Sequence, residues 1–513
     1  MNILTQIVQV LDRYKLRDID IIDSKDSESR YTELYRLIRE GSVKTDEDAA
    51  RHFYGAKATP NEGKYRVFKN EFKNRLLNTL YFIDTNNPVF TDFQSAYYSS
   101  QHQWGAINLL YRRNITVAAN ILAERLLTDC KKYELTDLCV LILERLKTSF
   151  ALQIGDRKKY EDFKTQFWHY KAVWEAEHLA LEAFEAIRID YVKSTAFRPE
   201  TSMKAQESLD SLEPLRQKYD SFMFIYSYFC VKEAVFSAKH DWKGVIEVCD
   251  ETLALFEAKP FTMKSYIGII KNQKVIALLM LKRYEECHIT LNEALDLQEQ
   301  GNFNWFKTME KKVLLGFHTA HYTEGVETYK QVLDLKEFKS LQGHSAEIWK
   351  LFEANFYLVA SMGLLDKNKE MPFGKFRLNK FLNDIPNFSH DKKGMNIPVL
   401  VMQIALMIIE KMHYGLIDRI ENIEKYVVRN IPKTDIANYR SNQMIKILME
   451  IPKADFSRKI LEKTTKKLLE DLKSVPFDLR ETGYKIEVFP YDELWVKLLP
   501  WFGDKKLDIQ RIT

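Results

Sequence analysis

Two histidines with a spacing that suits metal binding, His318 and His321, stand three residues apart, and His344 follows further along the chain. Residues at this spacing lie one helical turn apart, so the two imidazoles can share a metal ion such as zinc. No acidic or cysteine residue stands at ligand spacing beside them, and the apolar pattern places them at a bend between two helices. We therefore expect exposed histidines and no bound metal.

The five cysteines are the other soft metal ligands of the chain, and none of them forms a C-x-x-C pair. Their odd number argues against a disulfide framework, and their wide separation argues against a zinc knuckle. We interpret each as a small buried apolar residue in a reducing cytosol. They are Cys130, Cys139, Cys230, Cys249 and Cys287.

The motifs of the common enzyme classes are missing from the sequence. It contains no H-E-x-x-H, no glycine-rich phosphate loop ending in Lys-Ser/Thr, no G-x-S-x-G and no G-x-G-x-x-G after a strand. Acidic pairs such as Glu285 and Glu286 fall on predicted solvated faces, whereas general acid–base catalysis needs a desolvated carboxylate. We expect no catalysis and no cofactor. An enzyme with an unrecognised site is the second alternative, which a pocket holding an acid of strongly raised pKa would favour.

One basic helix is predicted near the N-terminus, where Arg66, Lys69 and Lys73 lie opposite an apolar face. It is the last of three helices with a short middle one, a layout that resembles a helix-turn-helix whose basic helix enters a groove. Over residues 1–113, however, 17 Lys and Arg face 15 Asp and Glu. A solvated helix face is the simpler interpretation, and contact with nucleic acid is the alternative function.

A second basic run lies between residues 453 and 467. Over residues 435–513, 15 Lys and Arg face 13 Asp and Glu, so the positive charge is local. We interpret the run as a solvated helix surface, with docking of an acidic partner as the alternative. The residues that would contact such a partner are Arg458, Lys459, Lys463, Lys466 and Lys467.

The elements that would position a site are clearest between Trp242 and Leu335, where three blocks repeat one apolar pattern. Each block begins with a ring residue, and small or apolar residues follow at the spacing of one buried helix face. Other apolar helices are predicted between the blocks, so the repeating unit is a helical hairpin that needs stacked neighbours to bury its apolar face. The aligned residues are Trp242, Val245, Cys249, Thr252 and Leu253; then Tyr284, Cys287, Leu291, Ala294 and Leu295; then Tyr322, Gly325, Tyr329, Val332 and Leu333.

This pattern resembles the second helix of a tetratricopeptide repeat, and the phrase YEECHITLNEALDL matches it best. The ring residues stand 42 and 38 residues apart, against a period of about 34 in that family. The Trp-Leu-Gly signature of the family's first helix is missing, and a proline follows only the first block, at Pro260. The resemblance is clear over residues 220–340. It implies a divergent tetratricopeptide-like solenoid with a protein-binding or scaffolding role.

Four regions are predicted along the chain. Residues 1–90 form a small helical domain, 91–199 a helical region leading into the repeats, 200–475 the hairpin repeats, and 476–513 a C-terminal cap. Within the cap, the alternating residues 484–488 predict one short strand and residues 492–499 a final helix. A cap is expected because terminal units of a repeat array must cover exposed apolar surface.

The composition agrees with a helical protein. Only 17 glycines and 13 prolines occur in 513 residues, which indicates few tight turns and favours helices. The formal net charge of +4 provides no strong field over the whole surface. The N-terminus is a poor secretion signal, and no apolar run approaches a membrane span. We therefore expect a cytoplasmic protein.

The sequence as a whole predicts an all-α fold, a right-handed α-solenoid of antiparallel helical hairpins between a small N-terminal domain and the cap. The expected function is that of a non-catalytic scaffold or adaptor. A partner protein or peptide would bind on the concave face, in a groove lined by side chains of the first helix of each hairpin.

Overall fold

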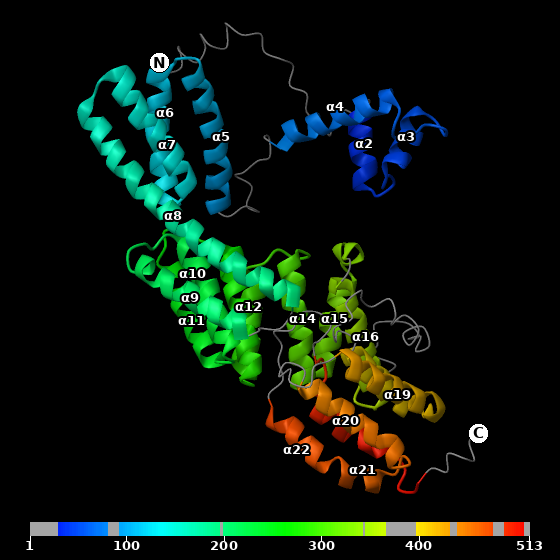
Figure 1. Cartoon of the computed structure of the whole chain (residues 1–513). Helices are drawn as coiled ribbons and strands as arrows, with labels where there is room; N and C mark the ends of the chain where they lie inside the picture. Colours follow the sequence, from blue (N-terminus) through cyan, green and yellow to red (C-terminus); the bar gives the residue numbers. More distant parts are fainter. Residues whose placement is uncertain are drawn as a thin grey trace. The chain divides into compact units, whose positions relative to one another are not determined.

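The structure is a computed structural model of the chain, drawn as a ribbon in Figure 1. It describes residues 29–80, 92–194, 199–341, 344–365, 397–430, 439–475 and 487–506. In these ranges the chain forms twenty-one α-helices and no β-strand, which confirms the all-α class. None of the described helices is long and apolar enough to cross a membrane.

The chain folds into two compact units. Unit 1 comprises residues 1–175 with the short segment 260–262, and unit 2 comprises residues 176–259 and 263–513. The helices of unit 1 are α2 (Arg30–Arg39), α3 (Asp46–Tyr54), α4 (Gly63–Leu80), α5 (Asp92–Arg112), α6 (Thr116–Lys132), α7 (Thr136–Ser149), a π-helical turn (Phe150–Ile154) and the first half of α8 (Arg157–Ser194).

The first three helices surround a small core of their own. The spacing of Thr45 and Asp48 predicts a capping box at the start of α3, with Asp in place of the usual Glu. It is present, because the hydroxyl of Thr45 accepts the N–H of Asp48 and the carboxylate of Asp48 accepts the N–H of Thr45. On α4, Tyr65, Phe68 and Phe72 are buried as the apolar pattern predicts. The core consists of Leu34, Ala49, Ala50, Ala58, Tyr65, Phe68 and Phe72.

Helices α5, α6 and α7 lie side by side in Figure 1 and share one apolar core with the start of α8. A chain of buried hydrogen bonds also joins them. The hydroxyl of Tyr111 donates to Asn120 at 2.8 Å, and the side-chain amide of Asn120 donates to Ser149 at 2.9 Å. The polar groups inside this bundle are thereby satisfied, as burial requires.

Unit 2 is built by sequential packing of helices. Each helix from α9 to α16 packs against its neighbour in the chain, and α12 also contacts α14. The helices are α9 (Pro199–Arg216), α10 (Phe222–Ala238), α11 (Trp242–Glu257), α12 (Lys264–Met280), α13 (Tyr284–Asp296), α14 (Phe303–His318), α15 (Tyr322–Leu333), α16 (His344–Ser361), α18 (Ile397–Ile409), α19 (His413–Asn430), α20 (Tyr439–Lys453), α21 (Arg458–Thr464), α22 (Lys466–Ser474) and α23 (Tyr491–Leu498), followed by a 3-10 turn at Leu499–Trp501.

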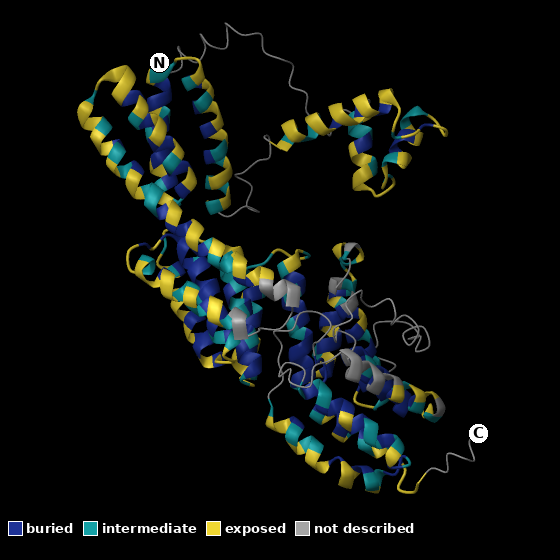
Figure 2. Ribbon diagram, viewed as in Figure 1, coloured by how far each residue is buried: buried dark blue, intermediate teal, exposed yellow. Residues whose placement is uncertain are grey.

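The three aligned ring residues are the first residues of α11, α13 and α15. Trp242 and Tyr322 are buried, and Tyr284 is half-buried. All nine aligned residues at the third, seventh and tenth positions after the rings are buried as well. The predicted buried face is therefore confirmed at these positions, whereas the aligned leucines at the eleventh position, Leu253, Leu295 and Leu333, are half-buried. Figure 2 shows the same division within the helices, with dark buried faces between yellow exposed ones.

One short turn joins six pairs of consecutive helices. A residue with φ between 52° and 58° stands two positions before the second helix, and none of these residues is glycine. In the turn before α13, the N–H of Lys282 bonds to the carbonyl of Leu279, and the N–H of Arg283 bonds to that of Leu278. This is the hydrogen-bond pattern of a Schellman motif. The left-handed residues are Asn114, Glu134, His240, Lys282, Ala320 and Lys411.

The recurrence of this turn shows that hairpins extend beyond the residues where the sequence pattern is visible. It joins α5 to α6, α6 to α7 and α18 to α19, as well as the three central pairs. The expectation that a glycine-poor chain has few tight turns is wrong for these connections. Their left-handed positions are occupied by residues that carry a Cβ, and the adjacent hydrogen bonds hold them there.

Two further expectations need correction or lie outside the described residues. The apolar pattern of the sequence predicts a single helix from Phe456 to Leu472, but the chain forms α21 and α22, which are separated at Thr465. The described end of the expected strand, Glu487 and Val488, is not a strand. The same pattern predicts helices at residues 3–14 and 373–382, which lie outside the described residues, as do residues 484–486 of the expected strand. The final helix is confirmed as α23.

Candidate functional site

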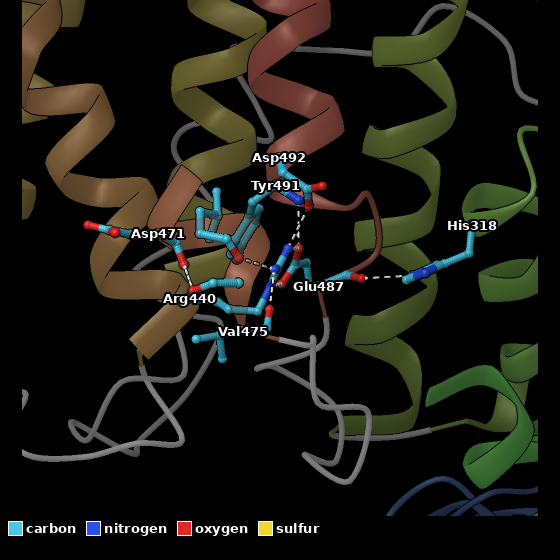
Figure 3. A network of polar contacts seen from close by, with 9 residues as sticks. His318, Arg440, Asp471, Val475, Glu487, Tyr491 and Asp492 are labelled. Carbon is cyan, nitrogen blue, oxygen red and sulfur yellow. Dashed lines mark hydrogen bonds and ion pairs between the residues drawn. The ribbon is translucent and has the colours of Figure 1, made fainter. Parts of the chain in front are cut away.

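A buried polar network in unit 2 is centred on Arg440 of α20 (Figure 3). Its Nε and Nη2 donate to the two carboxylate oxygens of Glu487 at 2.8 and 2.6 Å, and Nη2 also donates to Asp492 at 2.7 Å. Its Nη1 donates to the backbone carbonyls of Leu472 and Val475, both at 2.7 Å. All five N–H donors of the guanidinium are therefore used.

Glu487 extends the network to two more elements. Its carboxylate accepts the backbone N–H of Tyr491 at 2.6 Å, next to the start of α23. Its backbone carbonyl lies 3.3 Å from Nε2 of His318, the last residue of α14 (Figure 3). A carbonyl oxygen only accepts, so the neutral imidazole carries its proton on Nε2. The network thus connects α14, α20, α22 and α23.

Burial and charge act in opposite directions on the titratable groups of the network. Burial alone would lower the pKa of Arg440, but the hydrogen bonds and charges of Glu487 and Asp492 outweigh it and raise the pKa. Burial lowers the pKa of His318 to about 4, and its hydrogen bond to Glu487 offsets this only in part. At neutral pH the network therefore contains one guanidinium, its carboxylates and an uncharged imidazole.

Aromatic contacts fix the same segment on the repeats. The ring of Phe489 stacks on Tyr322 of α15 at a centroid distance of 6.1 Å and lies 6.2 Å from Phe317 of α14. In the cap itself, the indole N–H of Trp495 donates to the hydroxyl of Thr465 at 3.1 Å, where α21 and α22 meet. These contacts and the Arg440 network attach the C-terminal segment with α23 to the rest of unit 2.

The arrangement around Arg440 is suited to holding helices together. The guanidinium donors are saturated by protein oxygens, so they have none left for a substrate anion. A neighbouring cavity, lined by residues including Leu351, Met402 and Phe489, has a volume of about 10 Å³. A cavity of that size holds at most about one water molecule.

A second buried charge cluster lies on α14. The carboxylate of Glu310 is buried, and Nζ of Lys307 lies 2.9 Å from both of its oxygens. Burial raises the pKa of Glu310, and the nearby Lys307 reduces that shift. Burial also lowers the pKa of Lys311 to about 8, and its amine donates to the carbonyl of Lys307 at 3.2 Å.

The enzyme alternative required a pocket that holds an acid of strongly raised pKa, and the Glu310 cluster supplies a buried acid with a raised pKa. Its carboxylate is, however, occupied by Lys307, and Glu310 does not line the cavity beside Phe489. Within the described residues, no three His, Cys, Asp or Glu side chains are arranged to hold a metal ion.

Half-buried lysines of α10 and α12 form ion pairs with exposed acids of α11 and α13. Lys232 pairs with Glu251 at 2.9 Å, and Lys271 pairs with Glu293 at 2.7 Å. Lys274 pairs with an acid of α11 in the same way. Each pair joins the first helix of one hairpin to the second helix of the same or the preceding hairpin. These lysines therefore already have acidic partners within unit 2.

The residues predicted to contact nucleic acid lie on one helix, and Lys69 among them forms an ion pair. Arg66, Lys69 and Lys73 are all exposed on α4. Lys69 forms an ion pair with Asp46 of α3 at 2.7 Å, and Tyr65 donates to the same carboxylate. The hydrogen bond from Lys69 is the largest cause of the lowered pKa of Asp46. Lys69 therefore has a structural partner in unit 1.

The residues predicted to contact an acidic partner lie on two consecutive helices, α21 and α22. Arg458 pairs with Glu462 one turn on, at 2.8 Å. The four lysines are exposed, and in the described part of the chain none of them forms an ion pair or a hydrogen bond. They are Lys459, Lys463, Lys466 and Lys467.

One of the histidines expected to be exposed is buried. His318 is only 5% exposed, because the cap residues Glu487 and Phe489 lie against the end of α14. His321 is exposed as expected, and His344 begins α16 with a side chain outside the described residues. All five cysteines are buried free thiols, which confirms their predicted packing role. Burial raises the pKa of Cys130 and of Cys287 to about 12 in each case.

These features define an all-helical protein formed by sequential packing of helix pairs, in which a buried arginine holds the C-terminal helix α23. No family model, no curated protein and no solved structure matches the chain.

Sequence reasoning missed the two buried charge clusters. Arg440 and Glu487 are 47 residues apart, and His318 and Glu487 are 169 residues apart, so no local spacing relates them. Glu310 stands among lysines in the sequence M-E-K-K, which looks like a solvated face. The one available signal was the apolar character of α14 on both sides of this tetrapeptide, which indicates a helix buried on most of its surface.

Proposed function

We propose that the protein is a non-catalytic scaffold or adaptor whose hairpins form a right-handed, tetratricopeptide-like solenoid, with a partner protein or peptide bound on its concave face. The observation that supports this most is the recurrence of one hairpin turn through both units, with the aligned faces of α11, α13 and α15 buried. Such stacking presents an ordered surface, which lowers the entropic cost of binding.

The proposed groove is lined by first helices of the hairpins, α10, α12 and α14. Many of their side chains are buried, and residues such as Gln273 of α12 and Lys312 of α14 are half-buried at the surface. The second helices expose residues such as Glu247 of α11 and Glu285 of α13. The two faces can therefore be tested separately.

Site-specific photocrosslinking in the native host tests this proposal. A photoreactive amino acid at position 273 or 312 should crosslink one recurring partner protein, and the same amino acid at position 247 or 285 should not. Crosslinks to that partner only from positions 247 and 285, or no recurring partner from any position, would contradict the proposal.

A regulator that contacts nucleic acid through α4 is the second candidate function, and the exposure of Arg66 and Lys73 favours it. Phosphate contacts lose affinity steeply as salt rises. Replacement of Arg66 and Lys73 by glutamate should then abolish salt-sensitive retention on duplex DNA or RNA. Unchanged retention in the double variant would eliminate this function.

A further inference from the structure

The lysine surface is the group of exposed lysines on α21 and α22, to which the structure adds Lys473 near the end of α22. In the described residues none of its members forms an ion pair. The neighbouring cations differ, because Lys453 pairs with Glu450, Arg458 with Glu462 and Lys506 with Asp455. The lysine surface consists of Lys459, Lys463, Lys466, Lys467 and Lys473.

The positions of two of these lysines oppose the local preference of the helix. Lys466 and Lys467 are the first two residues of α22, whereas Lys463 lies three residues before Lys466, in the last turn of α21, where a positive charge is favoured. Positive side chains in a first turn lie against the positive end of the helix dipole, where acidic residues are favoured. Residues that violate a local rule without a compensating contact are expected where function requires them.

The surface is held on a well-fixed support. Thr465, between the two helices, is buried and accepts the indole N–H of Trp495. The end of α22 is held by Arg440, which binds the carbonyl of Leu472. Leu461 faces the core from α21. The lysines therefore project from helices whose inner sides are packed on the cap.

The chemistry of the surface discriminates among anionic partners. Neither α21 nor α22 exposes a large apolar or aromatic side chain, so the surface has no anchor for a bilayer and no platform for base stacking. Exposed acids interrupt the lysines, with Glu462 on α21 and Glu470 between Lys466 and Lys473. The charges of a phosphate backbone are regularly spaced and would also fall opposite these acids, whereas a protein segment can place its carboxylates opposite the lysines and uncharged residues opposite the acids.

We propose that the lysine surface is a docking site for an acidic segment of a partner protein. This inference rests on the proposed scaffold function, since the partner is a protein, but it concerns α21 and α22 and not the first helices of the hairpins. Attraction between the lysines and the acidic segment supplies affinity at low salt and decreases as salt rises.

Binding of a fluorescein-labelled Glu/Ala peptide to the full chain at low salt tests this inference. Replacement of Lys463, Lys466 and Lys467 by glutamate should weaken peptide binding roughly tenfold or more. A matched variant with glutamate at Lys158, Lys243 and Lys336, all exposed elsewhere, should bind as the wild type does. A double variant with glutamate at Lys466 and Lys467 alone should also melt at a higher temperature than the wild type, because acids suit the first turn of α22.

Three outcomes would overturn the inference. They are equal weakening in both triple variants, unchanged binding in the first, or a labelled DNA duplex that binds more tightly than the peptide and loses binding in the first variant. Crosslinking from positions 273 and 312 tests the scaffold function separately. If the Glu/Ala peptide does not bind through the lysine surface but those crosslinks are still observed, only this inference is contradicted. If the crosslinks are absent but the peptide still binds through the lysines, only the proposal of a binding groove on the first helices is contradicted.

Discussion

Single residues in unit 2 show how a charge is made tolerable inside a helical protein. Arg440 is buried, yet every one of its N–H groups has an oxygen partner, and two carboxylates balance its charge. Breaking such a pair costs more than the pair contributes, because the remaining charge stays buried without compensation. The network therefore acts as a connection between distant segments of the chain.

Replacement of Arg440 by methionine should lower the free energy of unfolding by about 3–5 kcal/mol, since Glu487 and Asp492 lose their common partner. Urea denaturation followed by circular dichroism measures the change. Replacement of Arg458 by methionine is the control, because its exposed pair with Glu462 is worth about 1 kcal/mol or less. Similar losses in the two variants would show that the network does not stabilise the fold.

His318 gives unit 2 a defined dependence on pH. Its pKa is about 4 in the folded chain, against 6.5 for an unperturbed imidazole. The unfolded state therefore binds a proton that the folded state rejects, and this contribution to stability is complete above pH 6.5 and lost as pH falls toward 4. Each unit of pKa difference corresponds to about 1.4 kcal/mol. The variant His318→Gln should thus lose less stability than the wild type over this range, as unfolding curves at several pH values measure. Parallel losses would contradict the assignment.

At the scale of elements, the sequence could predict those helices whose apolar residues recur at regular spacing. The apolar spacing located α11, α13 and α15 and their buried faces, because each signal lies within a few helical turns. The connections were harder to predict, because their left-handed residues include Glu134, Lys282 and Ala320, whose types give no turn signal. Thr465, where α21 and α22 separate, accepts a hydrogen bond from Trp495, 30 residues away, and local spacing does not report a contact of that kind.

Gly316 of α14 sets the distance between two helices. A Cβ at this position would lie 3.2 Å from the backbone nitrogen and Cα of Gly325 in α15 and 3.1 Å from the carbonyl of His321. Because backbone atoms cannot rotate away, Gly316→Ala should destabilise the chain by about 1–3 kcal/mol. Gly105→Ala in α5 is the matched control. Its added Cβ meets no atom within 4 Å, and alanine favours helix by about 0.5–1 kcal/mol. Denaturant unfolding of both variants measures the difference, and a neutral Gly316→Ala would contradict the close approach.

The hairpin turns predict a substitution that stabilises the fold. Ala320 is exposed and has a φ of 58°, which costs an L-residue with a Cβ about 1 kcal/mol. Glycine adopts this conformation without that cost, so Ala320→Gly should raise the free energy of unfolding by a fraction of that amount, less the extra freedom that glycine has in the unfolded chain. Thermal unfolding measures the shift. A clear decrease in melting temperature would show that the turn before α15 is not left-handed.

At the scale of the whole molecule, the two buried charge clusters and the repeated turn belong to one arrangement of packed helical hairpins. Hairpins bury their aligned faces, and the segment that leads into α23 is attached to α14, α15 and α20 by contacts with His318, Tyr322 and Arg440. The sequence predicted the hairpins and the final helix, but not the contacts that attach it. Those contacts join residues that are far apart in the chain, whereas pattern analysis reports local spacing.

Hydrogen exchange of the full chain, with and without the partner recovered by crosslinking, tests the central claim most directly. If the protein works by offering the first-helix face of stacked hairpins, the partner should slow amide exchange chiefly in α10, α12 and α14, where binding suppresses local opening. Protection confined to the second helices α11, α13 and α15, or to α4 alone, would contradict it.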